Sequence, residues 1–130
     1  MKSILPVVLL VLAALSFSAR GKESIARDVE ARMRAEPNVV SFYVEGLHCK
    51  NCASDIYSEM AELAFVDASR FESGLDFDKE GGFFLVAVKP SRDVEPGAVK
   101  RAIDAAGFGE KGLWFYQLAD EKLTIQQLVK

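Results

Sequence analysis

The order in which strand-like and helix-like segments follow one another constrains the fold of this 130-residue chain more than any other feature. Three segments are rich in β-branched and aromatic residues and have a glycine or proline at or near one end, which is typical of strands; they are residues 39–45, 83–88 and 112–118. Two segments repeat apolar residues at helical spacing and are predicted to be amphipathic helices; they are residues 51–65 and 94–106. Residues 66–77 are a weaker strand candidate, because Leu75 and Phe77 alternate but Gly74 interrupts them.

The second predicted helix carries signals at both ends. Pro96 falls in its first turn, where a missing N–H does no harm, and Gly107 follows its last turn, where glycine commonly ends a helix. The resulting order is β-α-β-β-α-β. It predicts an α+β, ferredoxin-like sandwich, in which a four-stranded antiparallel sheet carries two helices on one face. The block of residues 38–118 is long enough to bury such a core without a disulfide or a metal ion.

Two flanking segments extend this predicted domain. Residues 19–37 place Ile25, Val29 and Met33 four positions apart among charged residues, which indicates a short helix with a narrow apolar stripe. We expect this N-terminal helical extension to pack loosely or to be partly disordered. Residues 119–130 form a C-terminal tail, for which the sequence indicates at most a helical turn.

An uncharged apolar run at residues 4–17 follows Lys2 and precedes small residues. This is the pattern of a secretory signal peptide, which we predict to be residues 1–18, with cleavage after residue 18 or 21. The run is too short to cross a hydrocarbon core of roughly 30 Å. We therefore expect a periplasmic or secreted protein without stable membrane insertion after cleavage.

Composition argues against several function classes. The chain has two cysteines and one histidine, too few for a disulfide scaffold or for a closed four-ligand zinc site. Its formal net charge of -3, without a cluster of lysines and arginines, argues against nucleic acid as a partner. No serine–histidine–aspartate set and no phosphate-binding loop is visible, so we expect no enzyme activity. Asp76, Asp78 and Glu80 match the start of a calcium loop, but Ala87 stands where that loop needs glutamate, which favours an acidic hairpin turn.

The chemistry of the chain lies in a Cys-x-x-Cys motif between the first predicted strand and the first predicted helix. Cys49 is expected in the loop and Cys52 in the first helical turn, so that both sulfurs reach one point beside the helix N-terminus. The partial positive charge of that end and the nearby Lys50 favour thiolates over thiols. Gly46 lets the backbone bend without a Cβ clash. Two convergent thiolates in an open loop suit soft ions such as Cu(I) or Hg(II) better than Mg(II) or Ca(II).

Two short motifs frame this predicted site. They are Gly46-Leu47-His48-Cys49-Lys50-Asn51-Cys52 and, after the second helix, Ala106-Gly107-Phe108. In these motifs the chain resembles the heavy-metal-associated domain family, which includes small copper chaperones, modules of metal-transporting ATPases and the periplasmic mercury-binding protein. The resemblance covers about residues 39–115 and implies that Cys49 and Cys52 bind the metal. It also implies that Leu47, which replaces the family's usual Met, packs inward to shape the loop, and that Phe108 lies close to the site.

The motif and the resemblance together predict an exported soft-metal carrier. It would hold one Cu(I) or Hg(II) ion on Cys49 and Cys52 and pass it to a partner by ligand exchange; Zn(II) and Cd(II) stay open as further ions. His48 is a candidate third ligand, and Lys50 is another residue expected near the metal. We expect a monomer whose partner is a membrane metal transporter or another metal-binding domain. Two alternatives stay open: a thiol–disulfide redox protein that uses the same cysteines, and an interaction module that binds no metal.

Overall fold

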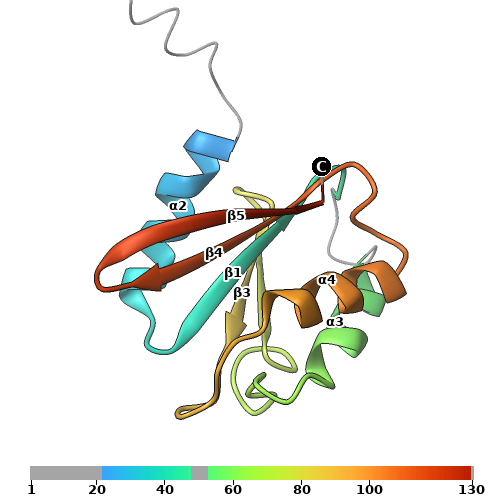
Figure 1. The fold of residues 1–130 in the computed structure, drawn as a ribbon, viewed down its shortest axis with the longest axis horizontal. Coiled ribbons are helices and arrows are strands. Elements are labelled where there is room, and N and C mark those ends of the chain that lie inside the picture. Colours follow the sequence, from blue (N-terminus) through green and yellow to red (C-terminus); the bar gives the residue numbers. More distant parts are fainter. Residues whose placement is uncertain (1–21, 48–52, 130) are drawn as a thin grey trace, which may run out of the picture.

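The computed structural model describes residues 22–47 and 53–129 (Figure 1). They form three layers, with one antiparallel sheet between a single helix on one face and two helices on the other. The elements are α2 (Lys22–Ala35), β1 (Val39–Val44), α3 (Ser54–Ala61), β2 (Leu75–Asp78), β3 (Phe83–Ala87), α4 (Pro96–Ala105), β4 (Leu113–Ala119) and β5 (Lys122–Val129). The expected α+β class is confirmed. The predicted signal peptide, residues 1–18, lies outside the described residues. Within the described ranges, no helix has the length and apolar character needed to span a membrane.

The sheet contains five strands in the order β2-β3-β1-β4-β5, and every neighbouring pair is antiparallel. β1 is therefore the central strand, and its Phe42 lies opposite Phe84 of β3 on one side and Phe115 of β4 on the other. The prediction of four strands with helices on one face is wrong in both respects. β5 adds a fifth strand, and α2 covers the second face, which is why β3 is buried along its whole length.

α3 and α4 cover one face of the sheet and enclose the larger apolar core (Figure 1). Ile56 and Met60 of α3 and Val99 and Ile103 of α4 are fully buried in one cluster with Phe42 of β1. These are the residues that the helical spacing of the sequence places on the inner faces of the two helices. Sequence periodicity therefore locates this side of the core correctly.

Of the two helices on this face, α4 is close to its predicted length and α3 is shorter than predicted. α4 begins at Pro96, and the chain leaves it through Gly107, whose φ of +88° is a conformation that glycine adopts readily. α3 ends at Ala61. Beyond it the chain turns, so that Phe65 and Val66 enter the core from outside the helix. The apolar residues after Ala61 suggested a longer helix, and of these Phe65 is buried although the backbone there is not helical.

α2 covers the opposite face of the sheet (Figure 1). Val29 and Met33 are buried in a second cluster with Phe83, Leu85 and Tyr116 of the sheet. The expectation that this extension packs loosely or is partly disordered is wrong. A narrow apolar stripe is sufficient to dock the helix on the sheet, because the sheet face beneath it is itself apolar and aromatic.

A charged contact fixes the last turn of α2 to β2. Arg32 donates hydrogen bonds from Nη2 to Asp76 at 2.6 Å and from Nη1 to Asp78 at 2.9 Å. The two aspartates are two positions apart on one strand, so both carboxylates lie on the α2 face. The hydrogen bond to Asp76 is the largest of the effects that raise the pKa of Arg32. Asp78 also accepts from the N–H of Gly81 at 2.8 Å, as expected for an acidic hairpin turn.

The C-terminal segment is a strand, and the interpretation of residues 119–130 as a tail with at most a helical turn is wrong. β4 and β5 are joined by Asp120 and Glu121, whose φ values of +51° and +65° are those of a type I′ hairpin turn. Leu123 packs on the α2 side of the sheet and Leu128 on the α3/α4 side. The segment is therefore part of the domain and contributes to both of its cores.

Candidate functional site

The candidate site is the connection that leads from β1 into α3. The predicted metal ligands and their polar neighbours fall on residues outside the described part of the chain; they are His48, Cys49, Lys50 and Cys52. The structure describes the two flanks of this connection, which end at Leu47 and resume at Ala53. The packing of these flanks determines how the site is attached to the domain.

The flank on the β1 side turns at Gly46 and buries Leu47. Gly46 has a φ of +90°, and a Cβ at this position would lie 3.2 Å from Cδ of Lys111, so both backbone and space favour glycine. The N–H of Leu47 donates to the carbonyl of Val44 at 3.4 Å and closes the turn. Leu47 is 6% exposed and belongs to the core beneath α3 and α4. This burial agrees with the inward packing that the resemblance implies, and its influence on a bound metal stays a prediction.

The flank on the α3 side is anchored by Ala53. This residue is the N-cap of α3, is fully buried, and makes no side-chain hydrogen bond to the helix. The N–H groups at the start of a helix carry partial positive charge, which favours an anion nearby. Asp55 in the first turn is exposed, and its negative charge opposes this effect. Asp55 thus opposes the support for thiolates that the sequence predicts at this helix end, and the cysteines themselves lie outside the described residues.

Phe108 closes the end of α4. Its N–H donates to the carbonyl of Ile103 at 3.1 Å, and the N–H of Gly107 donates to the carbonyl of Asp104 at 3.0 Å, which is the pattern of a Schellman cap. The ring is partly buried against the same cluster that contains Leu47. Two of the residues predicted to lie near the metal thus share one apolar cluster. The Ala-Gly-Phe motif also has a structural role, because it terminates a helix.

Lys111 lies at the base of the candidate site and was missed by the sequence motifs. The N–H of Glu45, directly after β1, donates to the carbonyl of Gly112 at 3.0 Å, which brings the start of β4 beside the end of β1. In consequence the side chain of Lys111 extends over Gly46, with Nζ 3.8 Å from where a Cβ of that glycine would be. The signal that could have found Lys111 is the pairing of the first and fourth strands that the predicted fold already implies.

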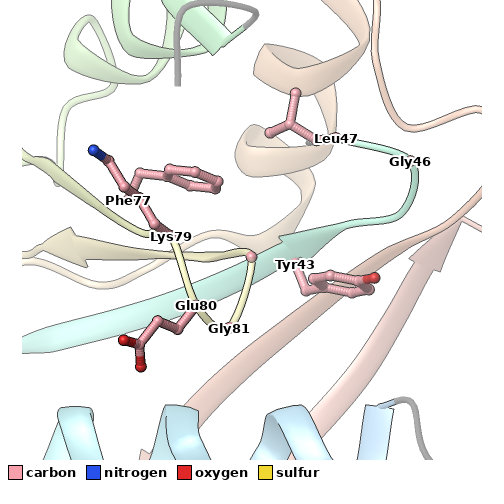
Figure 2. A pocket seen from close by; sticks show the side chains of 8 residues that line it. Tyr43, Gly46, Leu47, Phe77, Lys79, Glu80 and Gly81 are labelled. Atoms are coloured by element: carbon pink, nitrogen blue, oxygen red, sulfur yellow. The ribbon is translucent and has the colours of Figure 1, made fainter. Parts of the chain in front are cut away.

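A cavity of about 230 Å³ lies beside this flank, between the end of β1 and the β2–β3 turn (Figure 2). It is lined by Tyr43, Gly46, Leu47, Phe77, Lys79, Glu80, Gly81 and Gly82. Figure 2 shows the charged ends of Lys79 and Glu80 extended in opposite directions. Burial, and to a smaller extent the charge of Glu45, raises the pKa of Tyr43. Glycine backbone and aromatic side chains therefore line the cavity beside the candidate site.

No protein-family model matches the chain, and no curated protein matches it at a significant level. The resemblance to the heavy-metal-associated domain therefore rests on the two motifs and on the order of the elements. No group of three or more acidic, histidine or cysteine side chains suited to a metal ion occurs among the residues that the structure describes.

Proposed function

We propose that the chain is an exported carrier of one soft metal ion, with Cys49 and Cys52 as its two thiolate ligands. The observation that carries this proposal is the place of the Cys-x-x-Cys motif, which occupies the connection between the central strand β1 and helix α3. Two cysteines so close in sequence, between two fixed elements, can direct both sulfurs to one ion. Thiolates select soft ions, which favours Cu(I) or Hg(II).

The order of the strands supports a ferredoxin-like plan for the centre of the domain. If β5 is set aside, the sheet order is β2-β3-β1-β4, with α3 between β1 and β2 and α4 between β3 and β4. This is the split βαβ arrangement, which the resemblance to the heavy-metal-associated domain also implies. In this proposal α2 and β5 are additions to that core.

The buried flanks of the motif support a binding role. Leu47 and Ala53 are buried on its two sides, and Phe108 packs in the same cluster. A site whose supporting residues are fixed by packing needs less ordering when the ligand binds. Two thiolates and one Cu(I) ion carry a net negative charge, which the ammonium group of Lys111 at the base of the site would partly compensate.

Transfer in this proposal proceeds by ligand exchange. A thiolate of the partner binds the ion before Cys49 or Cys52 releases it, so no free ion and no change in oxidation state are needed. The partner is a membrane metal transporter or another metal-binding domain, and the encounter takes place in the periplasm or outside the cell. The predicted signal peptide supports this location.

The test is a titration of the reduced protein with Cu(I) and with Hg(II) against a chelator of known affinity. We expect one equivalent of metal to bind, and we expect Cys49→Ser and Cys52→Ser each to abolish binding without changing the circular dichroism spectrum. Ser54→Ala, at the first residue of α3, is the matched control and should bind one equivalent. His48→Ala separates two-coordinate from three-coordinate binding, because its affinity falls only if the imidazole is a ligand.

Failure of the wild type to bind either ion, or unchanged binding in both serine variants, would overturn the proposal. The redox alternative predicts a different result: insulin reduction by the pair, with a reduction potential in the catalytic range. The metal-free alternative predicts that a double serine variant still captures the same partner as the wild type.

A further inference from the structure

The outer edge of β5 is the longer of the two edges of the sheet. β5 has eight residues, whereas β2 at the opposite edge has four. The outward N–H and C=O groups of an edge strand are a template for pairing with another strand. β5 therefore offers a longer template than β2.

The two edges also differ in how they are protected against pairing. β2 carries Asp76 and Asp78, and both are bound to Arg32 of α2. β5 has a single charged residue, Lys122 at its first position, and no proline. Natural proteins place charges and prolines on edge strands to prevent association. β5 is therefore largely unprotected.

An exposed apolar side chain stands in the middle of β5. Ile125 is 46% exposed, and apart from Phe71 it is the only large apolar residue classed as exposed among the described residues. Thr124 and Gln126 on either side of it are exposed and uncharged. The centre of the strand thus has apolar surface to bury and no charge that opposes an approaching strand.

We propose that two copies of the chain pair through β5, antiparallel, about a two-fold axis at Ile125. In this register each Ile125 lies opposite its counterpart, Thr124 lies opposite Gln126, and Lys122 lies opposite Leu128. Opposite residues of an antiparallel pair share a face of the sheet with Cβ atoms roughly 5 Å apart, so the two isoleucines cover each other. The two five-stranded sheets become one continuous sheet.

The charge pattern favours a second copy as the occupant of this edge. The lysines of the two copies are six positions apart along the paired strands, roughly 20 Å at about 3.4 Å per residue. That separation exceeds the Debye length of about 8 Å at physiological ionic strength, so the chain does not repel itself here. One added strand pair buries less area than the roughly 1,200 Å² of a stable interface. The dimer should therefore be reversible, and it revises the expectation of a monomer.

The first test is analytical ultracentrifugation of the protein recovered after expression of the full chain, under reducing conditions. We expect the sedimentation coefficient to rise with concentration from that of a monomer to that of a dimer. Ile125→Lys places two like charges opposite each other and should stay monomeric at every concentration, with unchanged circular dichroism because the side chain is exposed. Phe71→Lys makes the same change at the other exposed apolar residue and should still dimerise.

The second test fixes the register by disulfide trapping in a background of Cys49→Ser and Cys52→Ser. Ile125→Cys should form a covalent dimer rapidly under mild oxidation, whereas Lys122→Cys should do so only slowly, because the two copies of residue 122 are far apart. The background lacks the proposed metal ligands, so the outcome is independent of metal binding. A wild type that is monomeric at all concentrations, a dimeric Ile125→Lys variant, or equal trapping rates would each overturn the proposal.

Discussion

At the scale of single residues, the aromatic side chains beneath α2 carry polar atoms that lack partners. The hydroxyl of Tyr116 and Nε1 of Trp114 are buried without a hydrogen bond. Ser41 on the same sheet differs, because its Oγ donates to the carbonyl of Phe84 at 2.6 Å. A buried polar group without a partner costs about 1–3 kcal/mol. Buried polar atoms without hydrogen-bond partners therefore occur on the α2 side of the sheet, whereas the cluster on the α3/α4 side is apolar.

We predict that Tyr116→Phe raises the free energy of unfolding by about 1 kcal/mol, because it removes the unpaired hydroxyl and keeps the ring. Urea unfolding monitored by tryptophan fluorescence measures the change. Tyr43→Phe is the matched control on the same face, where the hydroxyl is not among the buried unpaired atoms, and it should have little effect. A loss of stability in Tyr116→Phe would contradict the prediction.

The same residue makes stability depend on alkaline pH. Burial, and to a smaller extent Tyr43, raises the pKa of Tyr116 from 10.0 to about 12. Below pH 10 the phenol is protonated in both the folded and the unfolded chain. Between about pH 10 and about pH 12 the unfolded chain loses the proton first, so stability falls as the pH rises. Tyr116→Phe should show a shallower fall over this interval; an equal slope would contradict the assignment.

At the scale of elements, the ion pairs that Arg32 of α2 forms with Asp76 and Asp78 can be tested separately from the apolar stripe of the helix. We predict that Arg32→Gln lowers the free energy of unfolding by about 1 kcal/mol, since the ion pairs with Asp76 and Asp78 are only partly buried. Trp114, the only tryptophan, packs against the α2-side cluster and should report the change by its fluorescence. Arg27→Gln, at an exposed position of the same helix, is the control and should have no comparable effect. Equal losses of unfolding free energy in the two variants would contradict a specific contribution of these ion pairs.

The β4–β5 turn holds two non-glycine residues at positive φ, and the cost of this conformation can be measured. Glu121 has a φ of +65°, a conformation that costs little for glycine and more for other residues. We predict that Glu121→Gly raises the free energy of unfolding by roughly 0.5 kcal/mol, because relief of a left-handed backbone gives about 1–2 kcal/mol and the greater chain entropy of glycine takes back about 0.5–1 kcal/mol. The hydrogen bond that Arg34 donates is to the backbone carbonyl of residue 121 and is retained. Lys79→Gly, at a turn position whose own φ is not positive, should instead lower stability, and the two changes can be compared by thermal unfolding.

The elements that the sequence predicted well are those with local signals. α4 has a proline at its start and a glycine after its end, and both act within one turn of the helix. β5 was missed because its turn uses Asp120 and Glu121 in place of the glycine that usually marks a type I′ hairpin. The docking of α2 was missed because Arg32 finds its partners 44 and 46 positions away, where no local pattern can indicate them.

At the scale of the whole molecule, α2 is an integral layer of the domain. We predict that a chain starting at Glu36 loses its fixed tertiary structure, because it exposes Phe83, Leu85 and Tyr116 and gives up the burial of Val29 and Met33. Each buried aliphatic side chain contributes about 1.5–3 kcal/mol, a large part of the total stability of a small domain. Near-ultraviolet circular dichroism measures the loss, and a chain starting at Lys22 is the control. A cooperative thermal transition at the same temperature in both chains would contradict this prediction.

The chemistry proposed for the candidate site comes from the sequence motif, and the structure adds the surroundings of its two flanks. The proposed metal ligands rest on two cysteines in one short motif, which is local information. The position of Lys111 and the cavity beside Tyr43 depend on which strands are neighbours in the sheet. The predicted fold already implies the antiparallel pairing of β1 with β4, but no local pattern indicates which side chains this pairing brings together.

The central place of β1 has a consequence for how the cysteine motif is attached. Its backbone pairs with β3 on one side and with β4 on the other, so opening of either sheet edge leaves it in place. Amide protons of such a strand exchange with solvent only when the whole domain opens. A partner that pulls on the motif from the β1 side therefore works against global unfolding, whereas one that pulls on β5 works against a single strand pair.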